Sequence, residues 1–207
     1  MRALARGKGA RSSRPARRVR RAGARVVGAR GGAGGAARRR PLWPEARVAA
    51  QELSDAIRGL LMQELKAGGL EGAVAVCSTK APARTAEYRR TSRNDIRRVS
   101  LRYRNPANEP DTSEGRILES FDRLPAEARP AAEHWDVVRE DGGEALRYLK
   151  PVVANALCLT CHGEKAKIPP AVQAVLAREY PNDRATGFSV GDVRGAVSVR
   201  IRLVPPH

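Results

Sequence analysis

Hydrophobic residues first recur at helical spacing after Trp43-Pro44-Glu45, and the pattern continues to Gly68-Gly69. Proline in the first turn and glycine after the last are usual at the two ends of a helix. The pattern predicts an amphipathic helix over about 44–66, with apolar positions at Val48, Leu53, Ile57, Leu60, Leu61 and Leu65. An apolar run over 73–77 follows Gly72, and we interpret it as a short buried strand.

Alternation of apolar and polar residues predicts the remaining strands. Residues 96–104 alternate in this way, and residues 193–203 do so most regularly. Two further strands, near 133–140 and 145–152, flank Asp141-Gly142-Gly143, which is a strong hairpin signal. Shorter helices are predicted over 83–91, over 113–124 with Ser113 as the cap, and from Pro169-Pro170 to about Arg178.

The predicted order is helix, strand, strand, helix, hairpin, loop, helix and strand. Consecutive strands joined by tight turns favour an antiparallel sheet with helices packed against one face, so the predicted fold class is α+β. The chain of 207 residues is long enough for one domain, predicted over 43–207, preceded by a tail over 1–42.

The formal charge of +17 is concentrated in that tail. Residues 1–40 contain 14 Lys and Arg and no acidic residue, whereas the rest of the chain contains 25 basic and 22 acidic residues. A segment rich in Arg, Ala and Gly cannot bury a core, so we expect disorder there. The tail is either an arm that binds polyanions or upstream sequence included by a mis-assigned start. We favour the second interpretation, and expect no specific nucleic-acid partner, because the tail has no aromatic residue and no recognition motif.

The pentapeptide Cys-Leu-Thr-Cys-His at 158–162 carries the most specific chemistry in the chain. C-x-x-C-H is the attachment sequence of c-type haem. Two thiols at this spacing reach the two vinyl groups on one edge of a porphyrin and form thioethers, and the next histidine then stands over the ring centre. The motif predicts one covalently attached haem c, with Cys158 and Cys161 as anchors and His162 as the proximal axial ligand.

Other uses of these cysteines fit the sequence less well. A zinc site could combine Cys158 and Cys161 with Cys77 and a histidine, but no second C-x-x-C or H-x-x-x-H completes the pattern. A redox dithiol would be expected in a thioredoxin-like βαβ setting, and a disulfide across two intervening residues is strained.

Covalent haem attachment of this kind is normally completed outside the cytoplasm, so we expect a periplasmic or otherwise extracytoplasmic protein. The sequence has neither the apolar stretch of about 7–15 residues of a secretory signal nor the roughly 18 apolar residues of a transmembrane segment. Either the true N-terminus differs from this one, or export uses another signal.

Several stretches together resemble one family. They are Ala-Val-Cys-Ser-Thr at 75–79, the run over 96–111, Arg-Tyr-Leu-Lys-Pro at 147–151, the haem motif with Gly163, Tyr-Pro-Asn-Asp-Arg-Ala-Thr-Gly at 180–187, and the run over 191–199. Over about 50–203 the chain is similar to the single-haem c-type proteins with a PAS-like fold, which also occur as extracytoplasmic sensor modules. The resemblance implies a PAS-like antiparallel sheet with flanking helices and a C-terminal haem-attachment loop. It also implies that the motif histidine and a distal cysteine thiolate hold the iron, here His162 and Cys77.

From the residues alone, the second axial ligand stays open. Cys77 ends an apolar run and would ordinarily be a small buried core residue, and the alternatives are His134, Met62 and His207. Arginine pairs well with carboxylates, so Arg98, Arg102 and Arg104 are candidates to contact the haem propionates. For Arg102 and Arg104 we slightly favour a solvated polar strand face.

These features predict a haem-based redox or small-ligand sensor that works with a redox partner or a signalling protein. The alternative is a periplasmic single-haem electron-transfer protein. An enzyme would need an acid–base residue over an open position on the iron, and no residue at a predictable spacing supplies one, so we expect no catalytic activity. The sequence leaves the oligomeric state open.

Overall fold

The computed structural model describes residues 42–203 except 93, 141 and 142. The predicted tail, apart from Leu42, and the candidate ligand His207 lie outside the described residues. Within the described part, no helix combines the length and the apolar character that crossing a bilayer requires.

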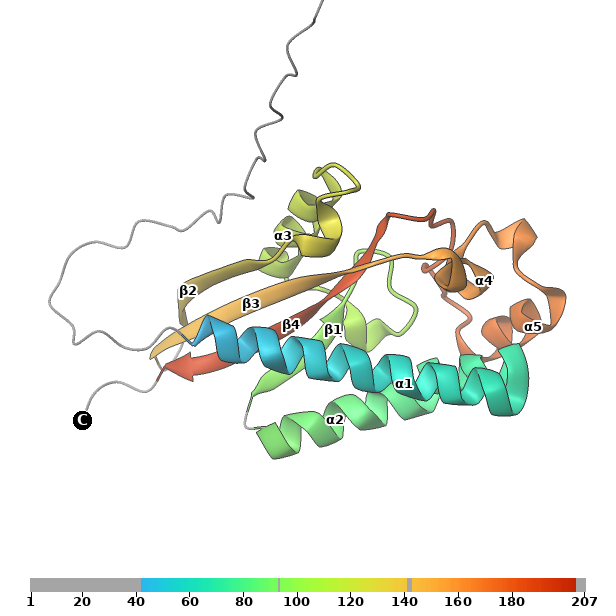
Figure 1. Ribbon diagram of the computed structural model, residues 1–207, viewed down its shortest axis with the longest axis horizontal. Helices are drawn as coiled ribbons and strands as arrows, with labels where there is room; N and C mark the ends of the chain where they lie inside the picture. Colours follow the sequence, from blue (N-terminus) through green and yellow to red (C-terminus); the bar gives the residue numbers. More distant parts are fainter. Residues whose placement is uncertain (1–41, 93, 141–142, 204–207) are drawn as a thin grey trace, which may run out of the picture. The chain divides into compact units, whose positions relative to one another are not determined.

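Four antiparallel strands form one sheet in the order β1-β4-β3-β2 (Figure 1). The strands are β1 (Asp95–Val99), β2 (His134–Glu140), β3 (Gly143–Val153) and β4 (Val193–Leu203). β2 and β3 form the predicted hairpin, and β3 and β4 are the long central pair. The α+β class, the hairpin and the C-terminal strand are therefore confirmed.

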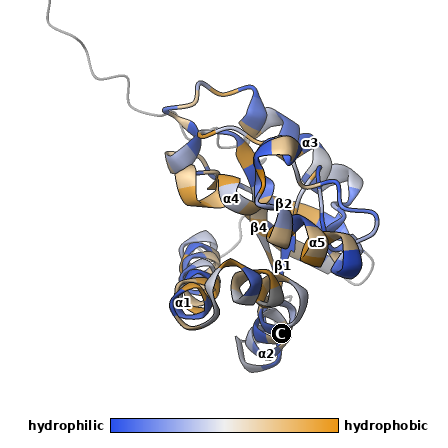
Figure 2. Cartoon of the chain, turned by 90° about the vertical axis from the view of Figure 1, so that its right-hand side faces the viewer, coloured by the Kyte–Doolittle hydropathy of each residue, from blue (hydrophilic) through white to orange (hydrophobic). Residues whose placement is uncertain are grey.

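Helices cover both faces of the sheet, so the prediction that they would cover one face was wrong. α1 (Trp43–Ala75) lies along one face with α2 (Ala81–Ser92) beside it, and α3 (Thr112–Asp122) lies on the other (Figures 1 and 2). A hydrophobic core lies on each face of the sheet, and successive residues of the strands point alternately into the two cores. Val197 and Val199 pack with Leu53 of α1, whereas Val99, Leu149 and Ala196 pack with Ile117, Leu118 and Phe121 of α3.

The predicted strand over 73–77 is helical instead. α1 is broken at Gly69, whose φ of 62° lies in the left-handed region that glycine adopts without strain. The chain then continues as helix to Ala75 and enters a π-helical turn over Val76–Lys80, which leads directly into α2. Val74 packs with Ile168 and Val172 beside α5 (Pro170–Glu179). A short apolar run buried in this way looks the same in sequence whether it is helix or strand.

The strand predicted over 96–104 ends at Val99. Ser100 bends the chain, because its Oγ bonds to the carbonyl oxygens of Arg102 at 3.0 Å and Arg194 at 2.8 Å. α3 begins with a cap at Asp111 rather than Ser113. The Asp111 carboxylate accepts from the Glu114 amide at 2.8 Å, and the Glu114 side chain accepts from the Asp111 amide in return.

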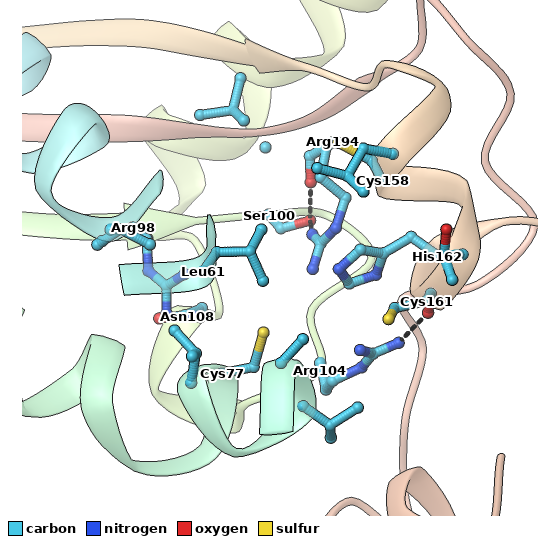
Figure 3. A pocket seen from close by; sticks show the side chains of 18 of the residues that line it. Leu61, Cys77, Arg98, Ser100, Arg104, Asn108, Cys158, Cys161, His162 and Arg194 are labelled. Carbon is cyan, nitrogen blue, oxygen red and sulfur yellow. Dashed lines mark hydrogen bonds between the residues drawn. The ribbon is translucent and has the colours of Figure 1, made fainter. Parts of the chain in front are cut away.

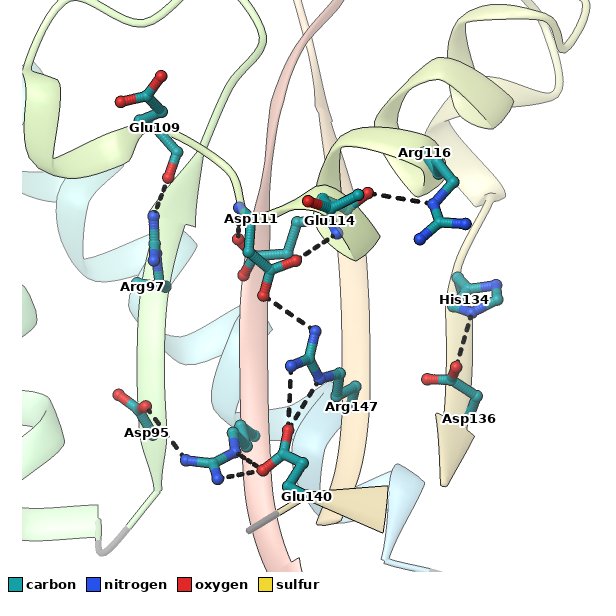
Figure 4. Close-up of polar contacts among 12 residues, drawn as sticks. Asp95, Arg97, Glu109, Asp111, Glu114, Arg116, His134, Asp136, Glu140 and Arg147 are labelled. Atoms are coloured by element: carbon teal, nitrogen blue, oxygen red, sulfur yellow. Dashed lines mark hydrogen bonds and ion pairs between the residues drawn. The ribbon is translucent and has the colours of Figure 1, made fainter. Parts of the chain in front are cut away.

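On the sheet face that α3 packs against, next to the area that α3 covers, charged side chains form a network (Figure 4). Glu140 accepts from Arg147 at 3.0 Å and from Arg200 at 2.6 Å, and Arg147 also donates to Asp111 at 2.9 Å. These contacts tie three strands to the start of α3.

Candidate functional site

One cavity gathers the residues with the most specific chemistry (Figure 3). One wall is the apolar side of α1, continued by the helical run to Val76. The opposite side is the segment over 152–162, and the floor comes from the ends of β1 and β4. Its apolar lining residues are Ile57, Leu61, Leu65, Leu70, Ala73, Val74, Val76, Val99, Val152, Leu157 and Ala196; its polar ones are Cys77, Arg98, Ser100, Arg104, Asn108, Cys158, Thr160, Cys161, His162 and Arg194.

The Cys-Leu-Thr-Cys-His segment forms a compact turn at this cavity. Asn155 starts it, with its side-chain oxygen accepting from the Cys158 amide at 3.3 Å, and the one-turn helix α4 (Leu159–His162) follows. Gly163 ends the turn, and a Cβ there would lie 2.6 Å from the Leu159 carbonyl oxygen, so only glycine fits. Neither motif cysteine forms a disulfide, and burial raises the pKa of Cys161.

His162 is held in one orientation and one tautomer. Its Nδ1 lies 2.7 Å from the carbonyl oxygen of Ala185, which can only accept, so Nδ1 carries the proton and Nε2 keeps its lone pair. Phe188 contacts the ring edge-on, with 6.3 Å between ring centroids. Burial, together with the positive charges of Arg194 and Arg104, holds the pKa of His162 well below its usual value. The imidazole is therefore neutral, and its Nε2 is free to accept a hydrogen bond or to bind a metal.

Cys77 lines the same cavity, and its sulfur points inward (Figure 3). The sequence placed it at the end of a strand, and that placement was wrong, because Cys77 lies in the π-helical turn after α1. The two other described candidates for a second ligand are elsewhere. Met62 is 41% exposed on α1, and His134 lies on β2 beside Asp136.

Three arginines line the cavity. Arg98 was a predicted member, and burial lowers its pKa. Arg104 was assigned to a solvated strand face, which was wrong: it is 5% exposed and donates to Asp183 at 2.9 Å. Arg102 does lie outside the cavity, half-exposed and stacked over the Phe188 ring at 3.5 Å.

Arg194 is the cavity residue that the sequence did not reveal. It stands at the start of β4, donates to Ser100 Oγ at 3.2 Å, and has a buried Nε without a partner. Burial lowers its pKa to about 10. In the sequence Arg194 is one polar position of a regularly alternating strand, and only the structure shows that its neighbours Val193 and Gly195 are both buried.

The arrangement of donors differs from a zinc site. Among the described residues, no three His, Cys, Asp or Glu side chains converge closely enough to hold a metal ion. The turn with Cys158, Cys161 and His162 and the separate residue Cys77 instead line one largely apolar cavity.

Fold and site together define an α+β domain with a C-x-x-C-H turn, a neutral histidine and a cluster of arginines around one apolar cavity. The model of the Tll0287-like family matches residues 39–202, and the chain belongs to this family. A solved structure titled as the cyanobacterial haem protein Tll0287 is similar at 26% identity, with a TM-score of 0.62, covering 80% of this chain and 97% of that one. No curated protein matches the chain.

Proposed function

We propose that this protein binds one haem c, attached covalently through Cys158 and Cys161. The observation that supports this most strongly is the position of the motif: both thiols and His162 lie on one turn that lines the cavity, and the hydrogen bond to Ala185 leaves Nε2 of His162 free. A solved relative is titled a haem protein, which agrees with this proposal.

The lining residues fit a haem in polarity and charge. The α1 wall is apolar, as a porphyrin face requires, and Arg98 at the far side of the cavity from the attachment turn is placed to meet propionates (Figure 3). Vinyl groups and propionates lie on opposite edges of the porphyrin, so this separation favours Arg98 over Arg104, which contacts the Cys161 carbonyl.

We propose that Nε2 of His162 and the sulfur of Cys77 would hold the haem iron. When bound, the haem iron would supply a one-electron redox couple. A thiolate favours the ferric state, so the reduction potential is expected to be low. While both residues held the iron, no position would be open for a substrate, and one would open only if Cys77 left; we propose no catalytic role.

A redox or small-ligand sensor in the periplasm or another extracytoplasmic compartment is the role that we favour. The support comes from the position of Cys77. Its π-helical turn continues without a break into α2, and α2 contacts β1 at the sheet edge. Movement of Cys77 would therefore be passed to α2 and the sheet, where a signalling partner could read it.

Electron transfer is the second candidate, and a different observation favours it. Val152 and Leu157 line the cavity and are nevertheless 38% and 43% exposed, next to Cys158. An apolar surface at the edge of a cofactor is suited to brief contact with a redox partner.

Optical spectroscopy of protein produced with a c-type maturation system tests these assignments. Attached haem should resist extraction by acidified acetone and give a pyridine haemochrome spectrum of c type, whereas Cys158→Ser with Cys161→Ser should release it. Cys77→Ala should keep the haem attached and change the oxidised spectrum; an unchanged spectrum would remove Cys77 from the ligand set. A sensor should bind carbon monoxide when reduced, and an electron carrier should not.

A further inference from the structure

The loop after α5 holds the proximal histidine through a chain of contacts. Residues 185–188 run beside α4, and the amides of Gly187 and Phe188 donate to the carbonyls of Gly163 at 2.7 Å and His162 at 2.9 Å. The Ala185 carbonyl accepts the Nδ1 proton of His162 at 2.7 Å. Ala185 is fully buried, and its own amide donates to Asp183 Oδ1 at 2.8 Å.

Arg104 closes this chain into a ring. Its Nε donates to the other Asp183 oxygen at 2.9 Å, and its Nη2 donates to the Cys161 carbonyl at 2.6 Å. The side chains of Arg104 and Asp183 are only 4% and 13% exposed. Contacts therefore run from Cys161 through Arg104, Asp183 and Ala185 back to His162.

We propose that Asp183 and Arg104 are positioning residues that set the orientation and the donor strength of His162. The partner of the non-ligating nitrogen fixes the tautomer of a ligating histidine and raises its basicity. Here that partner is a backbone carbonyl, which cannot itself be exchanged by mutation. Asp183 places the carbonyl through the Ala185 amide, and Arg104 locks Asp183 to the attachment turn. The effect on iron rests on the proposed function; the effect on the imidazole does not.

A simpler role for Asp183 is to neutralise a buried arginine. In that case the two backbone hydrogen bonds of Gly187 and Phe188, together with the hydrogen bond from Arg104 Nη2 to the Ala185 carbonyl oxygen at 3.5 Å, would hold Ala185 in place without Asp183. The two roles differ in the response of His162 when Asp183 is changed, and stability alone does not distinguish them.

Three variants of Asp183 separate the contacts. Asp183→Asn keeps an oxygen for the Ala185 amide and removes the charge that faces Arg104. Asp183→Ala removes both contacts, and Asp183→Glu keeps the charge on a longer side chain. Arg104→Lys cannot reach Asp183 and Cys161 together, and it tests the ring independently if Asp183→Ala does not fold. Glu164→Gln is the control, because the Glu164 side chain is 61% exposed and pairs with Lys167 at the surface.

In the haem-loaded protein, the expected readouts are the one-electron reduction equilibrium and the iron–histidine vibration of the reduced form. Weaker hydrogen bonding at Nδ1 makes Nε2 a poorer donor, and the lost carboxylate charge also favours the reduced iron. We expect Asp183→Ala to shift the equilibrium at least tenfold toward the reduced form, about 59 mV, and to lower the vibrational frequency. Asp183→Asn should shift less, Asp183→Glu should lie nearer wild type, and Glu164→Gln should match it.

Nitrogen NMR of the histidine rings in the haem-free protein gives a readout without the cofactor. Wild type should show His162 as the Nδ1–H tautomer, and Asp183→Ala and Arg104→Lys should show mixed tautomers. If the variants lose thermal stability while tautomer, potential and vibration stay as in wild type, the proposal is overturned. If wild type attaches no haem but the haem-free variants still show the change of tautomer, the proposed function is overturned and the positioning role remains supported.

Discussion

Arg194→Met tests whether the cavity is built for an anionic occupant. The Nε of Arg194 is buried without a partner, and no carboxylate among the described residues forms an ion pair with this side chain. Methionine has similar length and no charge. We expect the haem-free protein to become more stable, because the folded chain no longer holds this cation away from water.

The lowered pKa sets the size of the effect. Burial brings the pKa of Arg194 from its usual value down to about 10, and at about 1.4 kcal/mol per unit this corresponds to about 3 kcal/mol. A cation with a lower pKa in the folded than in the unfolded state destabilises the fold at every pH below the folded value, so the full penalty applies at pH 7. Losing the contact with Ser100 Oγ subtracts about 1 kcal/mol. A net gain of about 2 kcal/mol is expected.

Urea unfolding of the haem-free full-length chain measures this gain. Arg102→Met is the matched control: Arg102 also contacts the Phe188 ring, but it is half-exposed and donates to the carbonyls of Thr186 and Gly187, so its loss should give no gain. With haem attached, the gain of Arg194→Met should shrink or reverse, since the proposed Cys77 thiolate places a negative charge in the same cavity. A haem-free Arg194→Met protein that is less stable than wild type would refute the reasoning.

Two further predictions concern stability outside the cysteine motif. Glu140→Gln should lower the free energy of unfolding by about 2 kcal/mol at pH 7. Hydrogen bonds from Arg200, then Arg147, hold the pKa of Glu140 below its usual value, so the stability that Glu140 contributes is present above its unfolded-state pKa and is lost as the pH falls through its folded-state pKa. In urea titrations, the stability difference between wild type and Glu140→Gln should be present at pH 7 and vanish near pH 3. A difference that stays constant with pH would contradict the prediction. Gly195→Ala should destabilise by about 2–3 kcal/mol in thermal melts, because its φ is 155° and a Cβ would lie 2.3 Å from the Val99 carbonyl oxygen. Gly59→Ala, whose added Cβ meets nothing within 4 Å in the middle of α1, should stabilise by about 0.5–1 kcal/mol, and equal effects of the two would contradict the steric argument.

The elements with strong periodicity were predictable from sequence. The hairpin of β2 and β3 and the C-terminal strand β4 follow from alternation and turn residues, and helix α3 follows from apolar residues at helical spacing that pack into one core. The end of β1 was not predictable. The alternation continues to Arg104, but Ser100 bends the backbone through contacts with Arg102 and the distant Arg194.

The site residues likewise differ in whether a local sequence pattern or tertiary contacts place them in the cavity. The attachment turn is local in sequence, so its spacing alone predicted three residues that the structure places together. Arg104 and Arg194 depend on tertiary contacts: one is buried by pairing with Asp183, and the other lies between buried neighbours at a strand end. Neither has a local signal that separates a buried arginine from a solvated one.

The position of Cys77 depends on the π-helical turn that follows helix α1, and this explains why the wrong element was predicted at a residue that still reaches the cavity. Val74 and Val76 are both 1% exposed, two residues apart, as on one face of a strand. In an ordinary helix, side chains two residues apart point in different directions. Val74 is buried because α5 packs near it, and Val76 is buried in the wall of the cavity. A π-helical turn contains one residue more than an α-helical turn and so rotates the next helix about its axis. The direction of the Cys77 side chain therefore depends on the geometry of Val76–Lys80, and a deletion in this turn would be expected to move its sulfur off the cavity while leaving both helices intact.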